Sequence, residues 1–214
     1  MDARTYSFLD SVLISIDHGI RTVFGNPPVS ERANPADGHP DTGLSEQDKL
    51  TAARLMRVNH AGEVAAQALY EGQALAARLP EVREKMDCAA QEENDHLNWC
   101  AQRVQELGQH TSVLNPLWYT GSFAIGAIAG LAGDKWSLGF AAETEHQVIR
   151  HLEDHLHRLP AQDKKSRAIL QQMKEDETRH ATIAIEAGGA MLPEPFKRLM
   201  ALTSKVMTHS AYWL

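Results

Sequence analysis

The sequence predicts an all-α protein of one domain, in which four long helices form a bundle and shorter helices surround it. Ala, Leu, Glu, Gln and Arg, which favour helices, fill long stretches of the 214 residues. Apolar residues in these stretches recur at helical spacing, and helix-breaking residues are few, with 14 Gly and 9 Pro. A hydrophobic fraction of 43% is sufficient for one buried core over residues 1–214.

The first part of the chain, about residues 1–46, predicts a peripheral helix and a loop. Apolar residues follow helical spacing over residues 6–24, and Gly25 with two prolines close behind it ends the pattern. The residues that follow, to about Gly43, are rich in Pro, Gly, Asp and Asn. We therefore expect a mobile loop there that bears on none of the ligands proposed below.

The core bundle is expected over about residues 47–187. Its helices are predicted at residues 49–79, 80–108, the stretch around residue 145, and 161–187. Ser45 is placed to cap the first helix, and Pro80 fits the first turn of the second. An almost purely apolar crossover segment, residues 116–133, joins the two halves, and a last amphipathic helix covers about residues 190–214. The crossover has roughly fifteen apolar residues, fewer than the roughly 20 that span a bilayer.

The charge and the cysteines limit what the chain can bind. A formal charge of −7, without a dense Lys/Arg cluster, argues against a nucleic-acid partner. Cys88 and Cys100 fall twelve positions apart in one predicted helix, too far apart to form a disulfide. The N-terminus carries charged residues among its apolar ones and does not resemble a secretory signal, so we expect a cytoplasmic protein.

A repeated Glu-x-x-His motif carries the functional prediction. Glu93 and His96 lie three residues apart in one predicted helix, and Glu177 and His180 do so in another. Each pair therefore projects from one helix face and can hold one metal ion. Both faces are otherwise apolar or small, which predicts that the pairs point into the core. About one such match is expected by chance in a chain this rich in Glu and His, whereas this chain has three.

The third match, Glu143-x-x-His146, shares its helix face with polar residues and is predicted to lie on a solvated face. Glu145 instead shares a face with apolar residues such as Leu152, so we expect Glu145 to point inward. Glu63 lies in the same way among small and apolar residues of the first core helix. An unpaired carboxylate is costly in such a place, so Glu63 needs a partner.

The two halves of the bundle repeat one pattern. Glu63 precedes the first Glu-x-x-His pair by thirty residues, and Glu145 precedes the second by thirty-two. One lone Glu and one Glu-x-x-His per helical hairpin is the ligand set of ferritin-like di-iron or di-manganese carboxylate bundles. We therefore expect a ferritin-like four-helix bundle with additional N-terminal, crossover and C-terminal helices. The predicted metal ligands are Glu63, Glu93, His96, Glu145, Glu177 and His180.

Two divalent ions would neutralise the four carboxylates and make burial of the whole set tolerable. The ligand types suit Fe(II) and Mn(II) alike, and iron is the expected metal. Two neighbouring ions with open positions can reduce dioxygen. Residues outside the set are expected to be solvated histidines (His60, His151, His155 and His157) or core side chains (Met56, Cys100 and Met173), and Tyr70 can belong to the core or the site.

The motif residues together resemble a known family. The runs that carry the resemblance are Met56-Arg-Val-Asn-His-Ala-Gly-Glu63-Val, Glu92-Glu93-Asn-Asp-His96-Leu, Glu143-Thr-Glu145-His and Glu175-Asp-Glu177-Thr-Arg-His180. Their order and spacing, over about residues 50–214, are similar to those of the bacterial demethoxyubiquinol hydroxylases of ubiquinone biosynthesis. The Asn-His-Ala-Gly-Glu run is more specific than Glu-x-x-His and separates this family from storage ferritins. The family's six ligands match the six residues predicted above.

The resemblance implies a mono-oxygenase with two Fe ions per chain that uses O2 to hydroxylate the ring of a polyprenylated methoxy-methyl-benzoquinol. Because such a substrate has a long isoprenoid tail, we expect a peripheral contact with the cytoplasmic face of the bacterial inner membrane. The apolar segment 116–136, with Trp118 and Trp136 near its ends, suits that contact and is expected to admit the quinol. A buried crossover helix is the alternative, and a homo-oligomer or a ubiquinone-biosynthesis complex stays open.

Other functions compete with this prediction. A ferritin-like iron-binding or ferroxidase protein would use the same ligands, but it should lack the apolar crossover and assemble into a soluble shell. A di-iron hydroxylase that acts on tRNA would need a basic face. A purely structural bundle would bind no metal.

Overall fold

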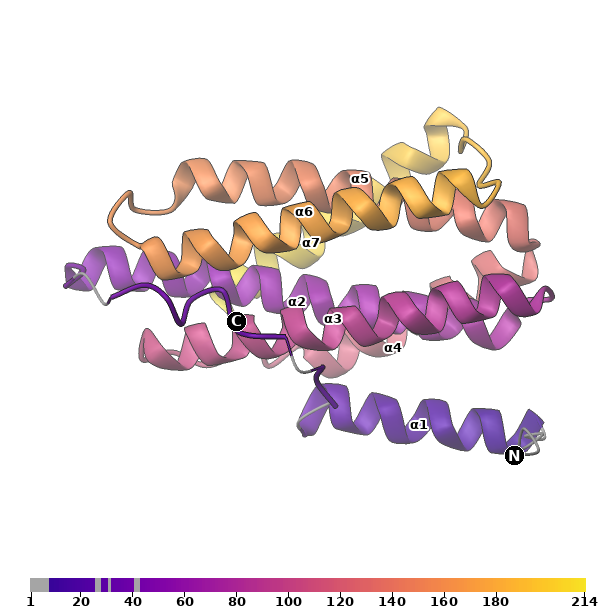
Figure 1. Ribbon diagram of the computed structural model, residues 1–214, viewed down its shortest axis with the longest axis horizontal. Helices are drawn as coiled ribbons and strands as arrows, with labels where there is room; N and C mark the ends of the chain where they lie inside the picture. Colours follow the sequence, from indigo (N-terminus) through magenta and orange to yellow (C-terminus); the bar gives the residue numbers. More distant parts are fainter. Residues whose placement is uncertain (1–7, 26–27, 31, 41–42) are drawn as a thin grey trace.

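The computed structural model describes residues 8–25, 28–30, 32–40 and 43–214, and these contain seven α-helices and no strand (Figure 1). The helices are α1 (Phe8–Phe24), α2 (Glu46–Ala76), α3 (Pro80–Glu106), α4 (Asn115–Leu131), α5 (Asp134–Arg158), α6 (Lys164–Glu186) and α7 (Glu194–Trp213). The all-α prediction is therefore confirmed. Residues 6 and 7, which the sequence places in the first helix, lie outside the described residues.

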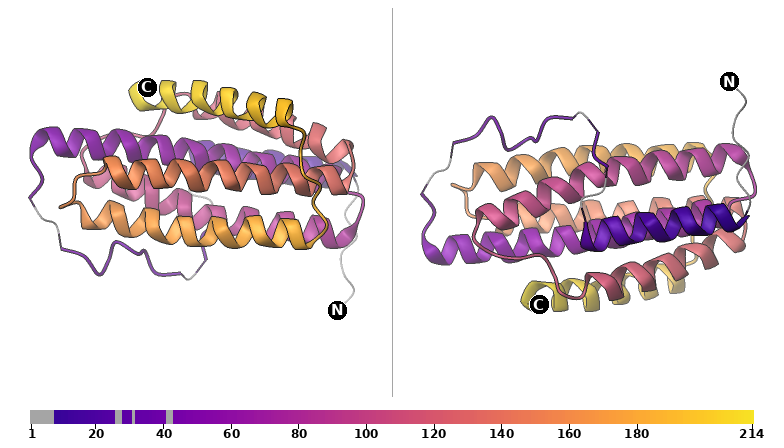
Figure 2. Two further views of the ribbon diagram at one scale, coloured as in Figure 1. Left: turned by 90° about the horizontal axis from the view of Figure 1, so that it is seen from above. Right: turned by 90° about the horizontal axis from the view of Figure 1, so that it is seen from below.

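Four of the helices form the core bundle as two hairpins that pack against each other (Figure 1). One hairpin consists of α2 and α3 and the other of α5 and α6, and contacts of α3 with α6 and of α2 with α5 join them. The additional helices α1, α4 and α7 lie outside the bundle, mainly against α2, and Figure 2 shows them from two sides. This arrangement is the one expected of a ferritin-like bundle with N-terminal, crossover and C-terminal additions.

The central helix α2 begins and ends about three residues earlier than predicted. Ser45 caps it as predicted, because its Oγ accepts a backbone N–H of the first turn at 3.1 Å. The helix stops at Ala76, since the N–H groups of Arg78 and Leu79 donate to the carboxylate of Asp134, both at 3.0 Å. These bonds join the turn between α2 and α3 to the start of α5.

Side chains around the whole circumference of α2 are buried, because α4 covers a side of it that the bundle leaves free. Two glycines let the backbones meet. A Cβ at Gly126 of α4 would lie 2.2 Å from the carbonyl oxygen of Leu69, and a Cβ at Gly72 would lie 2.3 Å from that of Phe123. The outer side of α4 is apolar and exposed, with Ile128 at 67%. Within the described residues, no helix has the length and apolar character that crossing a bilayer requires.

The loop before α2 contacts the bundle. The N–H of Ser30 donates to Asp95 of α3 at 2.8 Å. Arg32 places Nη2 2.6 Å from Oδ2 of Asp176 in α6, and its guanidinium lies 5.1 Å from the ring centre of Trp99. The described part of this loop is therefore held between α3 and α6, which differs from the mobile loop expected from its composition.

The glycine contact between α2 and α4 gives a prediction for stability. Gly126→Ala should lower the free energy of unfolding by about 3 kcal/mol, because the new Cβ meets a backbone oxygen that cannot move away freely. The matched control is Gly121→Ala in the same helix, where a Cβ meets nothing within 4 Å. This control should raise the free energy by about 0.5–1 kcal/mol. Urea unfolding measures both, and equal effects would show that α4 does not pack in this way.

Candidate metal centre

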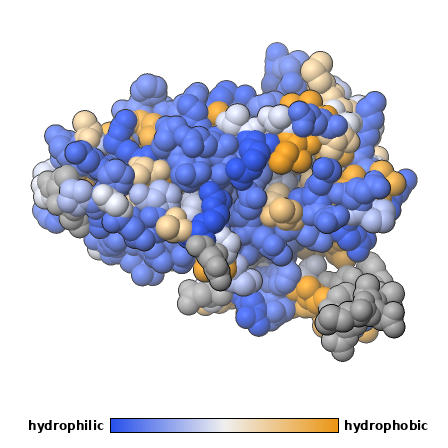
Figure 3. Space-filling view, viewed as in Figure 1, coloured by the Kyte–Doolittle hydropathy of each residue, from blue (hydrophilic) through white to orange (hydrophobic). Residues whose placement is uncertain are grey.

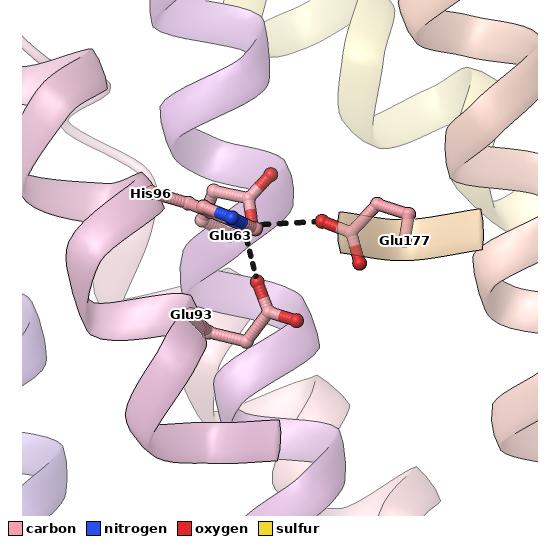
Figure 4. Close-up of side chains that lie close together, drawn as sticks. All are labelled: Glu63, Glu93, His96 and Glu177. Carbon is pink, nitrogen blue, oxygen red and sulfur yellow. Dashed lines mark hydrogen bonds and ion pairs between the residues drawn. The ribbon is translucent and has the colours of Figure 1, made fainter. Parts of the chain in front are cut away.

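The six predicted ligands lie together in the middle of the core bundle. They come from all four core helices: Glu63 from α2, Glu93 and His96 from α3, Glu145 from α5, and Glu177 and His180 from α6. Their ligand atoms form two groups, each within 4.8 Å: Glu63, Glu93, His96 and Glu177 (Figure 4), and Glu93, Glu145, Glu177 and His180. The carboxylates of Glu93 and Glu177 belong to both groups, so the arrangement offers two neighbouring positions for metal ions.

Helix periodicity explains why these side chains meet. On α3, the face of Glu93 and His96 continues through Cys100 and Val104, both fully buried. On α6, the face of Glu177 continues through the fully buried Met173. The apolar residues are buried between the hairpins, and the ligand residues are buried with them.

The buried donor set fits divalent metal ions. Glu93 and His96 have no exposed surface, and His180, the most exposed of the six, is 7% exposed. Oε1 of Glu93 and Oε1 of Glu177 are buried without a well-directed hydrogen bond within the described residues, and Nδ1 of His180 and Nδ1 of His96 lie 3.4 Å and 3.1 Å from them. Buried carboxylate oxygens that lack well-directed donors are costly unless cations bind them. Both oxygens belong to the carboxylates that the two groups share.

Burial and mutual repulsion act on the acidic groups. Burial raises the pKa of Glu63 well above its usual value, and the charge of Glu93 raises it further. Burial and the charge of Glu177 raise the pKa of Glu145 in the same way. Burial lowers the pKa of His96, but hydrogen bonds to carboxylates, first of all Asp176, outweigh it and hold this pKa well above its usual value. Without metal ions, protons on these groups therefore neutralise part of the negative charge of the site, and divalent cations would take the place of these protons.

The two histidines use their outer ring nitrogens in a crossed arrangement. Nε2 of His96 lies 3.0 Å from Oδ2 of Asp176 on α6, and Nε2 of His180 lies 2.8 Å from Oε2 of Glu92 on α3. Each outer carboxylate thus comes from the opposite hairpin. Arg179 forms ion pairs with both Asp176 and Glu92, so one guanidinium joins them. These contacts leave Nδ1 of each histidine facing the centre, as a metal ligand requires.

Sequence reasoning missed the outer carboxylates. A signal for them exists, because Asp176 and Glu92 each stand immediately before a shared glutamate, in an acidic doublet that both hairpins repeat. Arg32 of the N-terminal loop binds Asp176, the outer partner of His96, and the sequence pattern did not indicate this contact. Tyr70, for which the sequence allows the core or the site, contacts the site, because its hydroxyl donates to Glu145.

Glu145 faces the centre, whereas Glu143 does not. The predicted solvated face of Glu143 is nevertheless wrong, because this side chain is only 8% exposed. Its carboxylate accepts a hydrogen bond from Gln147 at 3.0 Å and lies 3.6 Å from Nζ of Lys197 on α7. The helical periodicity of the α5 sequence does not show that α7 covers the polar face of α5.

Two histidines expected in solvent are buried, so that expectation is wrong for them. Nδ1 of His155 lies 2.8 Å from Oδ1 of Asn59 on α2. His60 lies against Asn115 at the start of α4, and burial lowers the pKa of His60 to about 4. The expectation holds for His157, which is exposed, while His151 is half-buried. Met56, Cys100 and Met173 are core residues as predicted, and both cysteines are free.

Comparison with known proteins identifies the family. The sequence model of the family described as ubiquinone biosynthesis protein COQ7 matches residues 50–211. The chain belongs to this family. The resemblance that the motifs indicated is thereby confirmed, and the all-helical bundle agrees with it.

Similar proteins in three bacteria are named 3-demethoxyubiquinol 3-hydroxylase. The protein of Nitrosococcus oceani is 64% identical over the full length of both chains. That of Pseudomonas fluorescens is 56% identical over 98% of this chain and 97% of its own. That of Nitrosomonas eutropha is 53% identical over 96% of this chain and 99% of its own. The chain is therefore an enzyme of the hydroxylase class, and its buried Glu/His cluster is compatible with a metal centre.

The contrast between two neighbouring acids gives a prediction for metal binding. Glu145→Gln should weaken anaerobic Fe(II) binding by about 100-fold, because it removes a charged ligand from the second group. Glu143→Gln, two residues away, should leave the affinity within about threefold, since its partners lie on α5 and α7. Titration monitored by a competing chelator measures both. The assignment of the α5 ligand is wrong if only the Glu143 variant loses affinity.

Proposed function

We propose that this protein uses two iron ions and dioxygen to hydroxylate the ring of a polyprenylated demethoxyubiquinol. The observation that carries the proposal is the pair of overlapping ligand groups, with four carboxylates and two imidazoles, inside a chain whose relatives are named for this reaction. Carboxylate and imidazole are ligands that iron accepts. Two shared carboxylates suit a pair of ions better than a single one.

In this proposal, Glu63 and His96 would hold one ion and Glu145 and His180 the other, and Glu93 and Glu177, which belong to both groups, would contribute to both sites. When bound, the iron ions supply the electrons and open positions with which dioxygen is reduced. The side chains of this protein carry out the other parts of the function.

Those side chains hold the ligands in place and keep the site dry. Asp176 and Glu92 accept from Nε2 of the two histidines, which fixes the ring orientation and leaves Nδ1 free for the metal. The hydroxyl of Tyr70 donates to Glu145 and fixes the direction of that carboxylate. The surrounding apolar core excludes water, which protects reactive oxygen chemistry from side reactions.

The second candidate is a ferritin-like iron-binding or ferroxidase protein, which the same ligand set supports. The two differ in what is oxidised. A ferroxidase consumes dioxygen with Fe(II) alone and forms a soluble shell, whereas the hydroxylase places one oxygen atom of O2 on a quinol. The names of the relatives favour the hydroxylase.

A direct test combines metal stoichiometry with isotope labelling. Anaerobic Fe(II) titration of the full chain should saturate at two ions per chain. With reductant and ¹⁸O2, the loaded enzyme should convert detergent-solubilised demethoxyubiquinol to a product that contains one ¹⁸O atom, as measured by mass spectrometry. Saturation at one ion or none would falsify the two-iron proposal, and unlabelled or absent product would contradict the hydroxylase.

We also propose peripheral binding to the cytoplasmic face of the bacterial inner membrane, because the proposed substrate carries an isoprenoid tail. The support is an apolar surface across α1 and α4, which lie side by side. Its exposed apolar side chains are Leu9, Leu13, Ile16, Ile20 and Phe24 of α1 and Leu117, Ile125, Ile128 and Leu131 of α4. An exposed apolar surface of this kind suits the boundary between headgroups and acyl chains.

The α4 part of this surface can be tested without touching the centre. Ile125→Asp with Ile128→Asp should weaken binding to anionic phospholipid vesicles about tenfold or more, because two exposed apolar side chains become charged. Ala161→Asp with Gln171→Asp, both exposed near or on α6, controls for the added charge. Vesicle flotation measures the binding. If both pairs reduce it equally, charge alone acts and α4 is not the contact.

A further inference from the structure

A cavity of about 400 Å³ lies beside the metal centre and opens between α3 and α6. Its lining comes from α2, α3, α5 and α6, and includes none of residues 116–136. The space reaches from the surface to a buried polar cluster, so a small molecule can enter it from outside. Its volume falls in the range of about 300–1,000 Å³ that is typical of small-molecule sites.

The inner end of the cavity reaches residues of the centre. Tyr70, His180 and Glu92 all border it. The hydroxyl of Tyr70 donates to Glu145, and Nε2 of His180 lies 2.8 Å from Glu92. An occupant at this end would therefore touch His180, which is one of the six predicted ligands, and Tyr70, which donates to another. The hydroxyl of Tyr70 and the carboxylate of Glu92 are able to bind polar ring substituents.

The walls of the cavity are apolar, and small side chains keep them apart. Ala89, Ala141 and Ala184 are buried and face it from α3, α5 and α6. Met86 and Leu138, also buried, complete the apolar lining. A flat, apolar ring fits between such walls, whereas a larger residue at any of the three alanines would fill the space.

The mouth of the cavity is exposed between α3 and α6, and the face drawn in Figure 3 shows apolar residues there as separate spots among hydrophilic ones. Glu81, Glu84, Lys85 and Cys88 of α3 border it on one side, and Ile183 of α6, 38% exposed, borders it on the other. An opening to the surface lets a long tail leave the site while a ring stays inside. The second cavity, about 310 Å³ between α1 and α4, touches none of the six predicted ligands.

We infer that the cavity between α3 and α6 is the binding site for the quinol ring, with the ring at Tyr70 and His180 and the tail leaving past Cys88 and Ile183. The inference rests on the proposed function for the identity of the ring. It differs from the route predicted from sequence, in which the apolar segment 116–136 admits the quinol. That segment can contact a membrane without lining the path to the centre.

Cys88 allows a test on the full chain, because the only other cysteine, Cys100, is buried. The probe is a dimethoxy-methyl-benzoquinone with a short prenyl tail on the remaining ring carbon, so that no ring carbon is free for thiol addition and the tail passes Cys88. At saturation it should slow the labelling of Cys88 by a maleimide at least fivefold. As a control, Ser15→Cys in a Cys88→Ser background places the thiol in the α1–α4 cavity, and its labelling rate should not change.

Blocking the mouth gives a second readout. A bulky pyrenyl-maleimide adduct at Cys88 should weaken binding of the same quinone and raise the KM for demethoxyubiquinol, each about tenfold, while Fe(II) binding stays unchanged. A small methylthio adduct should change either value less than twofold. Treatment of Cys88→Ser protein with the bulky reagent should change neither value relative to the same variant without treatment.

The possible failures are distinguishable. If the enzyme hydroxylates the quinol but the quinone neither protects Cys88 nor is excluded by the bulky adduct, the cavity is not the ring site and the proposed function stands. If the quinone protects Cys88 and the adduct blocks it, yet no hydroxylation occurs, the cavity binds the ring and the proposed function is wrong. Protection of the control thiol at residue 15 instead of Cys88 would place the ring between α1 and α4.

Discussion

The burial of four carboxylates around one point is the constraint on which the rest of the structure depends. Like charges in a core repel one another and lose their hydration, so the site is tolerable only with protons, imidazoles or cations close by. The fold meets this requirement by bringing one face of each core helix to the same point. Glu63 and Glu145 supply one carboxylate each, and the two Glu-x-x-His pairs supply the rest. The bundle is therefore best understood as a support for a charged centre.

Helix periodicity made much of this predictable from the sequence. Residues three or four apart share a face, so apolar neighbours such as Cys100 and Met173 indicate which acids and histidines point inward. The same reasoning separated Glu145 from Glu143. It depends only on contacts within one helix, which explains why it predicted the helical class and the inward direction of the six clustered residues.

Features that depend on two distant segments were not predictable in this way. α2 has no single exposed face, because α4 packs on it through glycines, so its pattern does not show how many helices cover it. The pattern of α5 predicts a solvated Glu143, because the side chain that covers it, Lys197, belongs to α7 and does not appear in that pattern. Arg32 and Asp176 are 144 residues apart, and composition gave no reason to join a loop to the centre. The cavity is likewise a space between helices and has no sequence signature.

The crossed contacts of the two histidines have a consequence for how the protein folds while the ribosome makes it. During translation α3 leaves the ribosome well before α6, yet the outer partner of His96 is Asp176, 80 residues later. The partner of His180 is already present in α3, but the arginine that joins both outer carboxylates is again on α6. The first hairpin therefore cannot complete even its own half of the centre, and the acids of α2 and α3 have to wait for the second. Chains that end before α6 would carry carboxylates without these partners in an apolar face, and exposed apolar surface of this kind makes incompletely folded chains prone to aggregation.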